Sequence, residues 1–192
     1  MRVITGSAKG RPLATVKGRD IRPTSDKVKG SLFNVFGPRV VDCEFLDLFA
    51  GSGAVGIEAL SRGASQCVFV ELMTSHLKVV EENLAKTGLA ANAELLRRDA
   101  RSAVADLGRR GRTFDLIFVD PPYAKGLVNE ALEAIAEFGL LAPGGWVAAE
   151  HHKKDEVPTH VAGPANAGGL TRFRELVFGE TIISLYEVPA SL

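Results

Sequence analysis

The chain has 192 residues, of which 46% are hydrophobic, enough for one domain or for one domain with a small appendage. Its two cysteines exclude a disulfide framework and a four-cysteine zinc site, and they are typical of buried thiols in a reducing compartment. No run of about 18 apolar residues occurs, and the N-terminus lacks an apolar signal segment. We therefore expect a soluble, cytoplasmic protein with no membrane contact.

The charges are unevenly distributed, although the formal net charge is zero. Residues 1–40 contain nine Lys or Arg against two Asp, which gives +7, and the rest of the chain carries −7. This asymmetry indicates a polyanion-binding end attached to an ordinary domain. A solvated basic surface is the alternative interpretation.

The first 40 residues predict a basic extension and then a helix. Residues 1–23 are expected to form a flexible, cationic β-hairpin extension with strands Val3–Thr5 and Pro12–Val16. Residues 24–192 are expected to form the main domain. A helix begins after Pro23 and ends at Gly37-Pro38, since capping residues and spaced apolar residues lie between them. Its expected core face is Val28, Leu32, Val35 and Phe36. Lys27 and Lys29 lie off that face and could meet a ligand.

From residue 44, strand patterns alternate with helix patterns. The expected strands are Glu44–Phe49, Gln66–Val70, Ala93–Leu96, Phe114–Val119 and Trp146–Glu150. Residues 151–169 read as a loop, and Arg172–Val177 and Thr181–Tyr186 as a final hairpin. The alternation predicts an α/β fold, a parallel sheet with helices on both faces and an antiparallel strand from the hairpin. Ligands of such sheets bind beyond the carboxyl ends of the strands.

A glycine-rich turn follows the first of these strands. Its glycines, Gly51, Gly53 and Gly56, have the G-x-G-x-x-G spacing. They would allow a tight turn, close approach of the backbone to a ligand, and close packing of helix on strand, in that order. The pattern predicts a site for an adenosine-containing cofactor, either a nicotinamide dinucleotide or S-adenosylmethionine.

Acidic residues lie at or near the ends of the first three strands. Glu71 comes 15 residues after Gly56, where a carboxylate would accept hydrogen bonds from a ribose, or would only be a solvated strand end. Asp99 could accept from an adenine amino group or cap the next helix. Asp47 lies within an apolar strand, so its carboxylate needs partners, either the N–H groups of the turn or a cationic ligand.

The stretch Asp120-Pro121-Pro122-Tyr123 follows the fourth strand. Two prolines remove two backbone donors and fix φ, so the stretch is rigid and its oxygens are available to a ligand. Asp120 and the Pro121 carbonyl could hold the two hydrogens of a base amine and direct its lone pair toward an electrophile, while Tyr123 stacks on the base. A proline-rich strand exit with a packed tyrosine is the alternative. The four histidines have no metal-ligand spacing, so we expect no metal and read them as surface or loop residues.

These motifs resemble class I S-adenosylmethionine-dependent methyltransferases that act on exocyclic amines of bases. The resemblance rests on DLFAGSG from Asp47 to Gly53, on Glu71 and Asp99, and on DPPY, which adenine-N6 and guanine-N2 enzymes share. RPTSDKVKGSLFN from Arg22 and EALSRGA from Glu58 are more specific. With them the chain is similar, over nearly its whole length, to the RsmD family of 16S rRNA guanine-N2 methyltransferases.

The resemblance implies a Rossmann-like, seven-stranded methyltransferase sheet whose last strand is antiparallel. It implies methyl transfer from S-adenosylmethionine to the N2 amine of a guanine in 16S rRNA of the small ribosomal subunit, and we expect a monomer that needs no metal. The expected catalytic residues are Asp120, Pro121, Pro122 and Tyr123. The expected cofactor-binding residues are Asp47, Phe49, Ala50, Gly51, Ser52, Gly53, Glu71, Leu72, Asp99, Ala100 and Asp120. The expected RNA-binding residues are Lys9, Arg11, Arg22, Thr24, Lys27 and Lys29.

Two positions depart from the family pattern, and three other functions remain open. Gly30 stands where the family has Glu, and Met73 stands where an Asp is common. A base-amine methyltransferase for another RNA, or for adenine N6 in DNA, shares the DPPY stretch. An NAD-dependent oxidoreductase would explain the glycines and Glu71 only, and a non-catalytic RNA-binding protein would explain only the basic extension.

Overall fold

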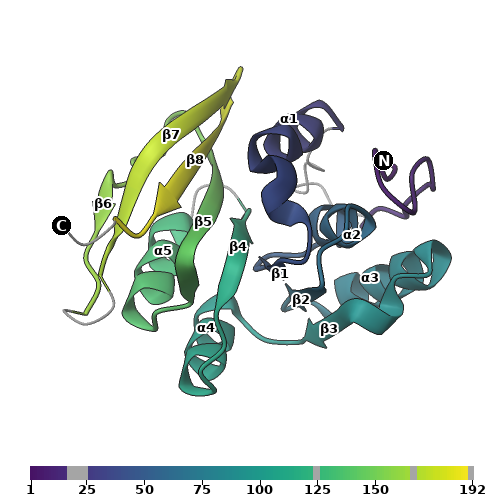
Figure 1. The fold of residues 1–192 in the computed structure, drawn as a ribbon, viewed down its shortest axis with the longest axis horizontal. Helices are drawn as coiled ribbons and strands as arrows, with labels where there is room; N and C mark the ends of the chain where they lie inside the picture. Colours follow the sequence, from purple (N-terminus) through teal and green to yellow (C-terminus); the bar gives the residue numbers. More distant parts are fainter. Residues whose placement is uncertain (17–25, 123–125, 165–167, 190–192) are drawn as a thin grey trace. The chain divides into compact units, whose positions relative to one another are not determined.

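The computed structural model describes residues 1–16, 26–122, 126–164 and 168–189 (Figure 1). They form two compact units, Met1–Asp99 and Ala100–Leu192. The boundary expected between residues 23 and 24 lies outside the described residues. Among the residues that are described, no helix is long and apolar enough to cross a membrane.

The first unit contains three parallel strands in the order β3-β2-β1. Its elements are α1 (Asp26–Phe36), η1 (Gly37–Val40), β1 (Glu44–Asp47), α2 (Ala54–Ser61), β2 (Gln66–Val70), α3 (Thr74–Thr87), η2 (Ala90–Asn92) and β3 (Ala93–Leu96). Asp47 pairs with Phe69, and Val70 pairs with Leu96. The residues that follow these strands therefore leave the sheet at the same edge, as the alternation predicted.

Helix α2 and an aromatic cluster form the centre of this unit. Every residue of α2 is buried, and the helix packs on β1 and β2. Phe33 and Phe36 of α1 lie against Phe45 of β1, with ring centroids 6.3 and 6.4 Å apart. The core face of α1 thus includes Phe33, where the spacing had favoured Val35, which is only half-buried. The bulky ring reaches the core from a position beside the expected stripe.

Residues 1–14, called the N-terminal segment below, fold back on themselves without forming the two expected strands. A single antiparallel bridge joins Arg2 to Pro12, and the Val3 N–H donates to the Arg11 carbonyl over 3.0 Å. Val3, Ala8 and Leu13 are buried. The segment is therefore part of the packed unit, and the expectation of a flexible extension is wrong for these residues.

The described residues of the second unit form five strands in the order β4-β5-β8-β7-β6. Strands β4 and β5 are parallel, and the pairs β5–β8, β8–β7 and β7–β6 are antiparallel. Its elements are α4 (Ala100–Arg109), β4 (Phe114–Val119), α5 (Leu127–Glu137), β5 (Leu141–His152), β6 (His160–Val161), β7 (Leu170–Phe178) and β8 (Thr181–Glu187). The predicted terminal hairpin is confirmed as the long pair β7 and β8 in Figure 1. Pairing of Val119 with Ala149 puts the end of β4 beside Ala149, three residues before the end of β5.

The described residues contain eight strands where seven were expected. The additional one is β6, two residues long, in the stretch 151–169 that read as a loop. Strand β5 also continues past Glu150 to His152, since β8 pairs with it as far as Thr181. These short pairings depend on a partner strand from later in the chain, which local composition does not reveal.

Candidate functional site

The glycine turn has the backbone that its three glycines allow. Gly51 and Gly53 have φ values of +54° and +75°, and Gly53 is the N-cap of α2. A Cβ on Gly56 would lie 2.3 Å from the Phe69 ring. The expected roles of Gly51 in the tight turn and of Gly56 in close helix–strand packing are confirmed.

Glu71, just after β2, is hydrogen-bonded to this turn. Its Oε2 accepts from the Gly51 N–H over 3.0 Å, and its Oε1 accepts from the Met73 N–H over 2.9 Å. A carboxylate offers about four acceptor positions, and the side chain is 12% exposed. His76 Nδ1 also lies 3.4 Å from Oε1, so the acceptor position that remains is on Oε2, the oxygen bonded to the turn. The structure thus brings together the two motifs that predicted a cofactor site.

Exposed apolar side chains adjoin Glu71. Leu72 and Met73 are 61% and 53% exposed, unusual for residues of this size. Met73, where the family commonly has Asp, contributes its backbone N–H to Glu71, and this contact does not depend on the side chain. A flat aromatic ligand beside Glu71 would find an apolar surface here.

Asp47 is hydrogen-bonded to the third glycine of the turn motif. Its Oδ2 accepts from the Gly56 N–H over 3.0 Å, and the residue is buried. Burial raises the pKa of the Asp47 carboxyl to about 7, the Gly56 hydrogen bond lowers it, and the Glu71 charge raises it. Of the two partners proposed for this carboxylate from the sequence, the backbone of the turn is the one the structure contains.

The remaining cofactor candidates lie near the same edge or begin the next unit. Phe49 is half-buried, and Ala50 and Ser52 are buried. Asp99 is exposed at the end of the first unit, beyond β3. Ala100 is the first residue of α4 in the second unit.

Asp120, Pro121 and Pro122 follow β4 in the second unit, and Tyr123 lies outside the described residues. Pro121 is buried, whereas Pro122 is exposed. A cavity of about 320 Å³ adjoins the two prolines, and its walls include the start of α5 and the end of β5. Asn129, Glu150, His151 and Lys154 contribute polar groups to these walls.

The sequence motifs did not indicate Glu150 or His151, which also line this cavity. Glu150 follows Ala149, the partner of Val119, and so lies beside Asp120 where β4 ends. His151 is buried, with Nε2 2.9 Å from Ser184 Oγ and Nδ1 3.1 Å from the His152 carbonyl. Burial lowers the pKa of His151. Its interpretation as a surface histidine is wrong, because β5 extends beyond the expected end.

The RNA-binding candidates differ in exposure. Lys9, Arg11 and Lys27 are exposed, and Arg11 also donates to the Lys86 carbonyl over 2.8 Å. Arg22 and Thr24 lie outside the described residues. Lys29 is fully buried, which corrects the expectation that it faces a ligand.

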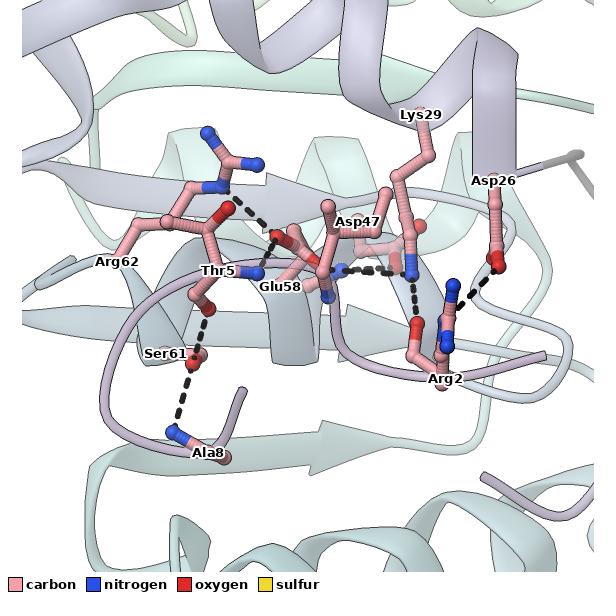
Figure 2. A network of polar contacts seen from close by, with 11 residues as sticks. Arg2, Thr5, Ala8, Asp26, Lys29, Asp47, Glu58, Ser61 and Arg62 are labelled. Carbon is pink, nitrogen blue, oxygen red and sulfur yellow. Dashed lines mark hydrogen bonds and ion pairs between the residues drawn. The ribbon is translucent and has the colours of Figure 1, made fainter. Parts of the chain in front are cut away.

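The Lys29 ammonium is held within the first unit (Figure 2). Its Nζ donates to the Arg2 carbonyl over 2.8 Å and lies 3.3 Å from Glu58 Oε2. Burial lowers the pKa of Lys29 from its usual 10.5, while the charge of Glu58 raises it. A bound phosphate would have to displace these contacts.

Glu58 of α2 is the centre of this network (Figure 2). Its oxygens accept from the Ile4 and Thr5 N–H groups, over 2.8 and 3.0 Å, and from Arg62 Nε over 2.8 Å. Three hydrogen bonds and the Lys29 ammonium therefore give this buried carboxyl group its polar partners. It joins the N-terminal segment and α1 to the helix that begins at the glycine turn.

Gly30, which departs from the family pattern, lies next to this network. Within the part of the chain that the structure describes, a Cβ at this position would meet only Ile4 Cδ1, at 3.8 Å, an ordinary contact distance. Backbone space therefore does not require glycine here. Among the described residues, no group of three or more His, Cys, Asp or Glu is arranged to hold a metal ion.

Comparison with known proteins identifies the family. The family model described as "Conserved hypothetical protein 95" matches residues 1–187. A Bacillus subtilis protein, YlbH, provisionally named an rRNA methyltransferase, is 41% identical over 97% of this chain and 98% of its own length.

An Escherichia coli K12 protein named ribosomal RNA small subunit methyltransferase D is 36% identical, over 99% of this chain and 91% of its own length. The solved structure of yhhF from Escherichia coli, provisionally described as a methyltransferase, is 36% identical and covers 100% of this chain and 99% of its own, with a TM-score of 0.84. With this fold and these matches, the chain belongs to the family described as "Conserved hypothetical protein 95", the RsmD family that its motifs resemble.

Proposed function

We propose that this protein transfers a methyl group from S-adenosylmethionine to the exocyclic N2 amine of a guanine in 16S rRNA. The hydrogen bond between Glu71 and Gly51 carries the cofactor part of the proposal, since it joins a ribose acceptor to the glycine turn. The RNA part is supported by the similarity to small subunit methyltransferase D. Such a substrate is found in the cytoplasm of a bacterium.

The residues at the sheet edge of the first unit fit the cofactor. The remaining acceptor position on Glu71 Oε2 would take a ribose hydroxyl group, and Leu72 would cover a face of the adenine, with Asp99 as the candidate acceptor for the adenine amino group. Gly51, Ser52 and Gly53 would lie along the remainder of the ligand. When bound, S-adenosylmethionine supplies a methyl group that its sulfonium already activates.

The second unit would hold the target base. Asp120 and the Pro121 carbonyl would accept the two N2 hydrogens and direct the nitrogen lone pair outward, and Tyr123 would stack on the extruded base. The cavity beside Pro121 gives the base a place, and the buried Glu150 in its wall could accept from the N1–H of a guanine. Catalysis would be mainly positioning, with Asp120 as the candidate acceptor of the proton that the amine loses.

The basic residues of the first unit would hold the RNA backbone. Lys9, Arg11 and Lys27 are exposed in the part of the chain where the excess of positive charge is concentrated. Contacts to phosphates release counterions, so binding should weaken steeply with salt. Arg22 and Thr24 remain candidates.

The substitution Asp120→Asn tests the catalytic assignment. It should lower methyl transfer to 16S rRNA by about 100-fold or more, because the amine loses a charged acceptor. The affinity for S-adenosylmethionine, measured by calorimetry, should stay within about 2-fold. Glu130→Gln, an exposed change on α5 of the same unit, is the matched control and should have no effect. An undiminished rate in Asp120→Asn would refute the role of Asp120.

The same calorimetry separates the proposal from an NAD-dependent oxidoreductase. The wild-type protein should bind S-adenosylmethionine and its demethylated product, and it should not bind NAD. Binding of NAD alone would overturn the proposed function, whatever the behaviour of the variants.

A further inference from the structure

Asn83 of α3 connects the N-terminal segment to the glycine turn. Its Oδ1 accepts from the Ala14 N–H over 2.8 Å, and its Nδ2 donates to the Ala14 carbonyl over 3.0 Å. The same Nδ2 donates to the Ser52 carbonyl over 2.9 Å. Ser52 lies between Gly51 and Gly53 of the turn. One side chain therefore contacts two parts of the sequence that are far apart.

The chemistry of the three partners fixes the orientation of this amide. The Ala14 N–H needs an acceptor, whereas the Ala14 and Ser52 carbonyls need donors, and only one orientation of an asparagine amide satisfies all three. Asn83 is 0% exposed, and its contact with the Ser52 carbonyl is buried, whereas its two contacts with Ala14 are half-buried. Loss of the side chain would leave the buried Ser52 carbonyl without this donor, which costs about 1–3 kcal/mol.

The N-terminal segment is held at its other end as well. Glu58 accepts from the Ile4 and Thr5 N–H groups, and Ser61 Oγ accepts from the Ala8 N–H over 3.0 Å. Both residues lie on α2, which begins at the turn. The segment thus contacts both helices that flank the glycine turn, and Asn83 is the contact that reaches the turn itself.

We propose that Asn83 is a positioning residue through which the N-terminal segment sets the shape of the glycine turn, and with it the affinity for the cofactor. The proposal rests on the function proposed above, because it assumes that the turn binds S-adenosylmethionine. Asn83 fixes the Ser52 carbonyl through the hydrogen bond from Nδ2, and the two hydrogen bonds with the Ala14 backbone fix the Asn83 side chain. Disturbing the segment at Ala14 should therefore weaken cofactor binding at a distance.

The first test removes the side chain. Asn83→Ala should raise the dissociation constant for S-adenosylmethionine about 10-fold, measured by calorimetry well below the melting temperature. At saturating cofactor, the rate of methyl transfer should recover, since the effect is on binding. Thr87→Val is the matched control. Thr87 is buried one turn further along α3, and its Oγ1 donates only to the Asn83 and Leu84 carbonyls of its own helix. The dissociation constant of the Thr87→Val variant for S-adenosylmethionine should change by less than about 2-fold.

The second test leaves Asn83 in place, in case its removal prevents folding. Ala14→Pro removes the N–H that donates to Asn83 Oδ1 and also stiffens the backbone at this position, and it should raise the dissociation constant about 3-fold. Thr15→Pro stiffens the same stretch but keeps the Ala14 N–H, and it should have no effect. The combined Asn83→Ala and Ala14→Pro changes should weaken binding no more than Asn83→Ala alone, since both act through one contact.

The outcomes separate this inference from the proposed function. If the folded Ala14→Pro and Asn83→Ala variants bind S-adenosylmethionine as the wild type does, the positioning role is wrong and the proposed function stands. If the two effects add, Ala14 does not act through Asn83, and the inference is also wrong. If the wild type fails to bind S-adenosylmethionine, both proposals fail.

Discussion

Asp47 shows how burial and a single hydrogen bond set the charge of one residue. The carboxylate is almost fully removed from water, and the Gly56 N–H is the backbone donor that opposes the resulting rise in pKa. With a folded-state pKa of about 7, against 3.8 for a free carboxyl, the folded protein binds a proton more tightly than the unfolded chain does. The contribution to stability is therefore complete below pH 4 and is lost as the pH rises to 7.

The substitution Asp47→Asn tests this pH dependence. The amide oxygen can still accept from Gly56, but it does not titrate. The free energy of unfolding of the wild type, relative to that of the variant, should fall by up to about 4 kcal/mol between pH 4 and pH 7. Chemical denaturation at several pH values measures this difference. A difference that stays constant over that range would mean that Asp47 is already ionised at pH 4.

At the scale of residues, the sequence predicted those side chains whose partners lie nearby in the chain or at the same sheet edge. Glu71 was found from its spacing after Gly56, and its contact with Gly51 agrees with that spacing. Asn83 was missed, although a signal exists. It follows Val80 by three residues and precedes Leu84, so it lies on the buried stripe of α3, where a polar residue needs a partner.

Helix α1 shows that two lysines two positions apart can have different roles. Lys27 is exposed, whereas Lys29 is buried against Glu58. Both lie off the stripe that the spacing predicted, so periodicity alone did not distinguish them. The deciding feature is the Glu58 carboxylate on α2, which is distant in the sequence and offers a buried counter-charge. The fold of the N-terminal segment was unpredictable for the same reason.

The two lysines make a matched pair for RNA binding. Lys27→Ala should weaken binding to 16S rRNA and reduce the slope of log affinity against log salt by about 1, because one phosphate contact is lost. Titrations of labelled RNA at several salt concentrations measure that slope. Lys29→Met should leave the slope unchanged. A slope reduced by the Lys29 change alone would place the phosphate contact at Lys29.

The same Lys29→Met variant should be less stable. It leaves the Arg2 carbonyl without its donor and removes one of the two cations beside Glu58. Glu58 keeps its contacts with Arg62 and with two backbone N–H groups. We expect the free energy of unfolding to fall by about 1–3 kcal/mol. Lys27→Ala should change it by less than about 0.5 kcal/mol, as is usual for an exposed residue. Denaturant titrations compare both variants with the wild type.

At the scale of the whole molecule, alternating strand and helix patterns were enough to predict the α/β class and the common sheet edge at which the first unit's strands end. The five strands expected for the parallel part of the sheet are present as β1 to β5, and the terminal hairpin is present as β7 and β8. What was missed, β6 and the extension of β5, depends on pairing with distant partner strands. The target base itself cannot be derived from Asp120-Pro121-Pro122, because guanine and adenine amines need the same acceptors. The proposal of guanine rests on the resemblance of the motifs to the RsmD family.

The most direct test of the account is transfer of a labelled methyl group from S-adenosylmethionine to naked 16S rRNA, to small subunits that lack the modification, and to DNA. Nucleoside analysis then identifies the modified base, and mapping identifies its position. We predict label in 16S rRNA, naked or within the subunit, on the N2 of a guanine at a single position, and none in DNA. Label on adenine N6, label in DNA, or no transfer to either rRNA substrate would contradict the account.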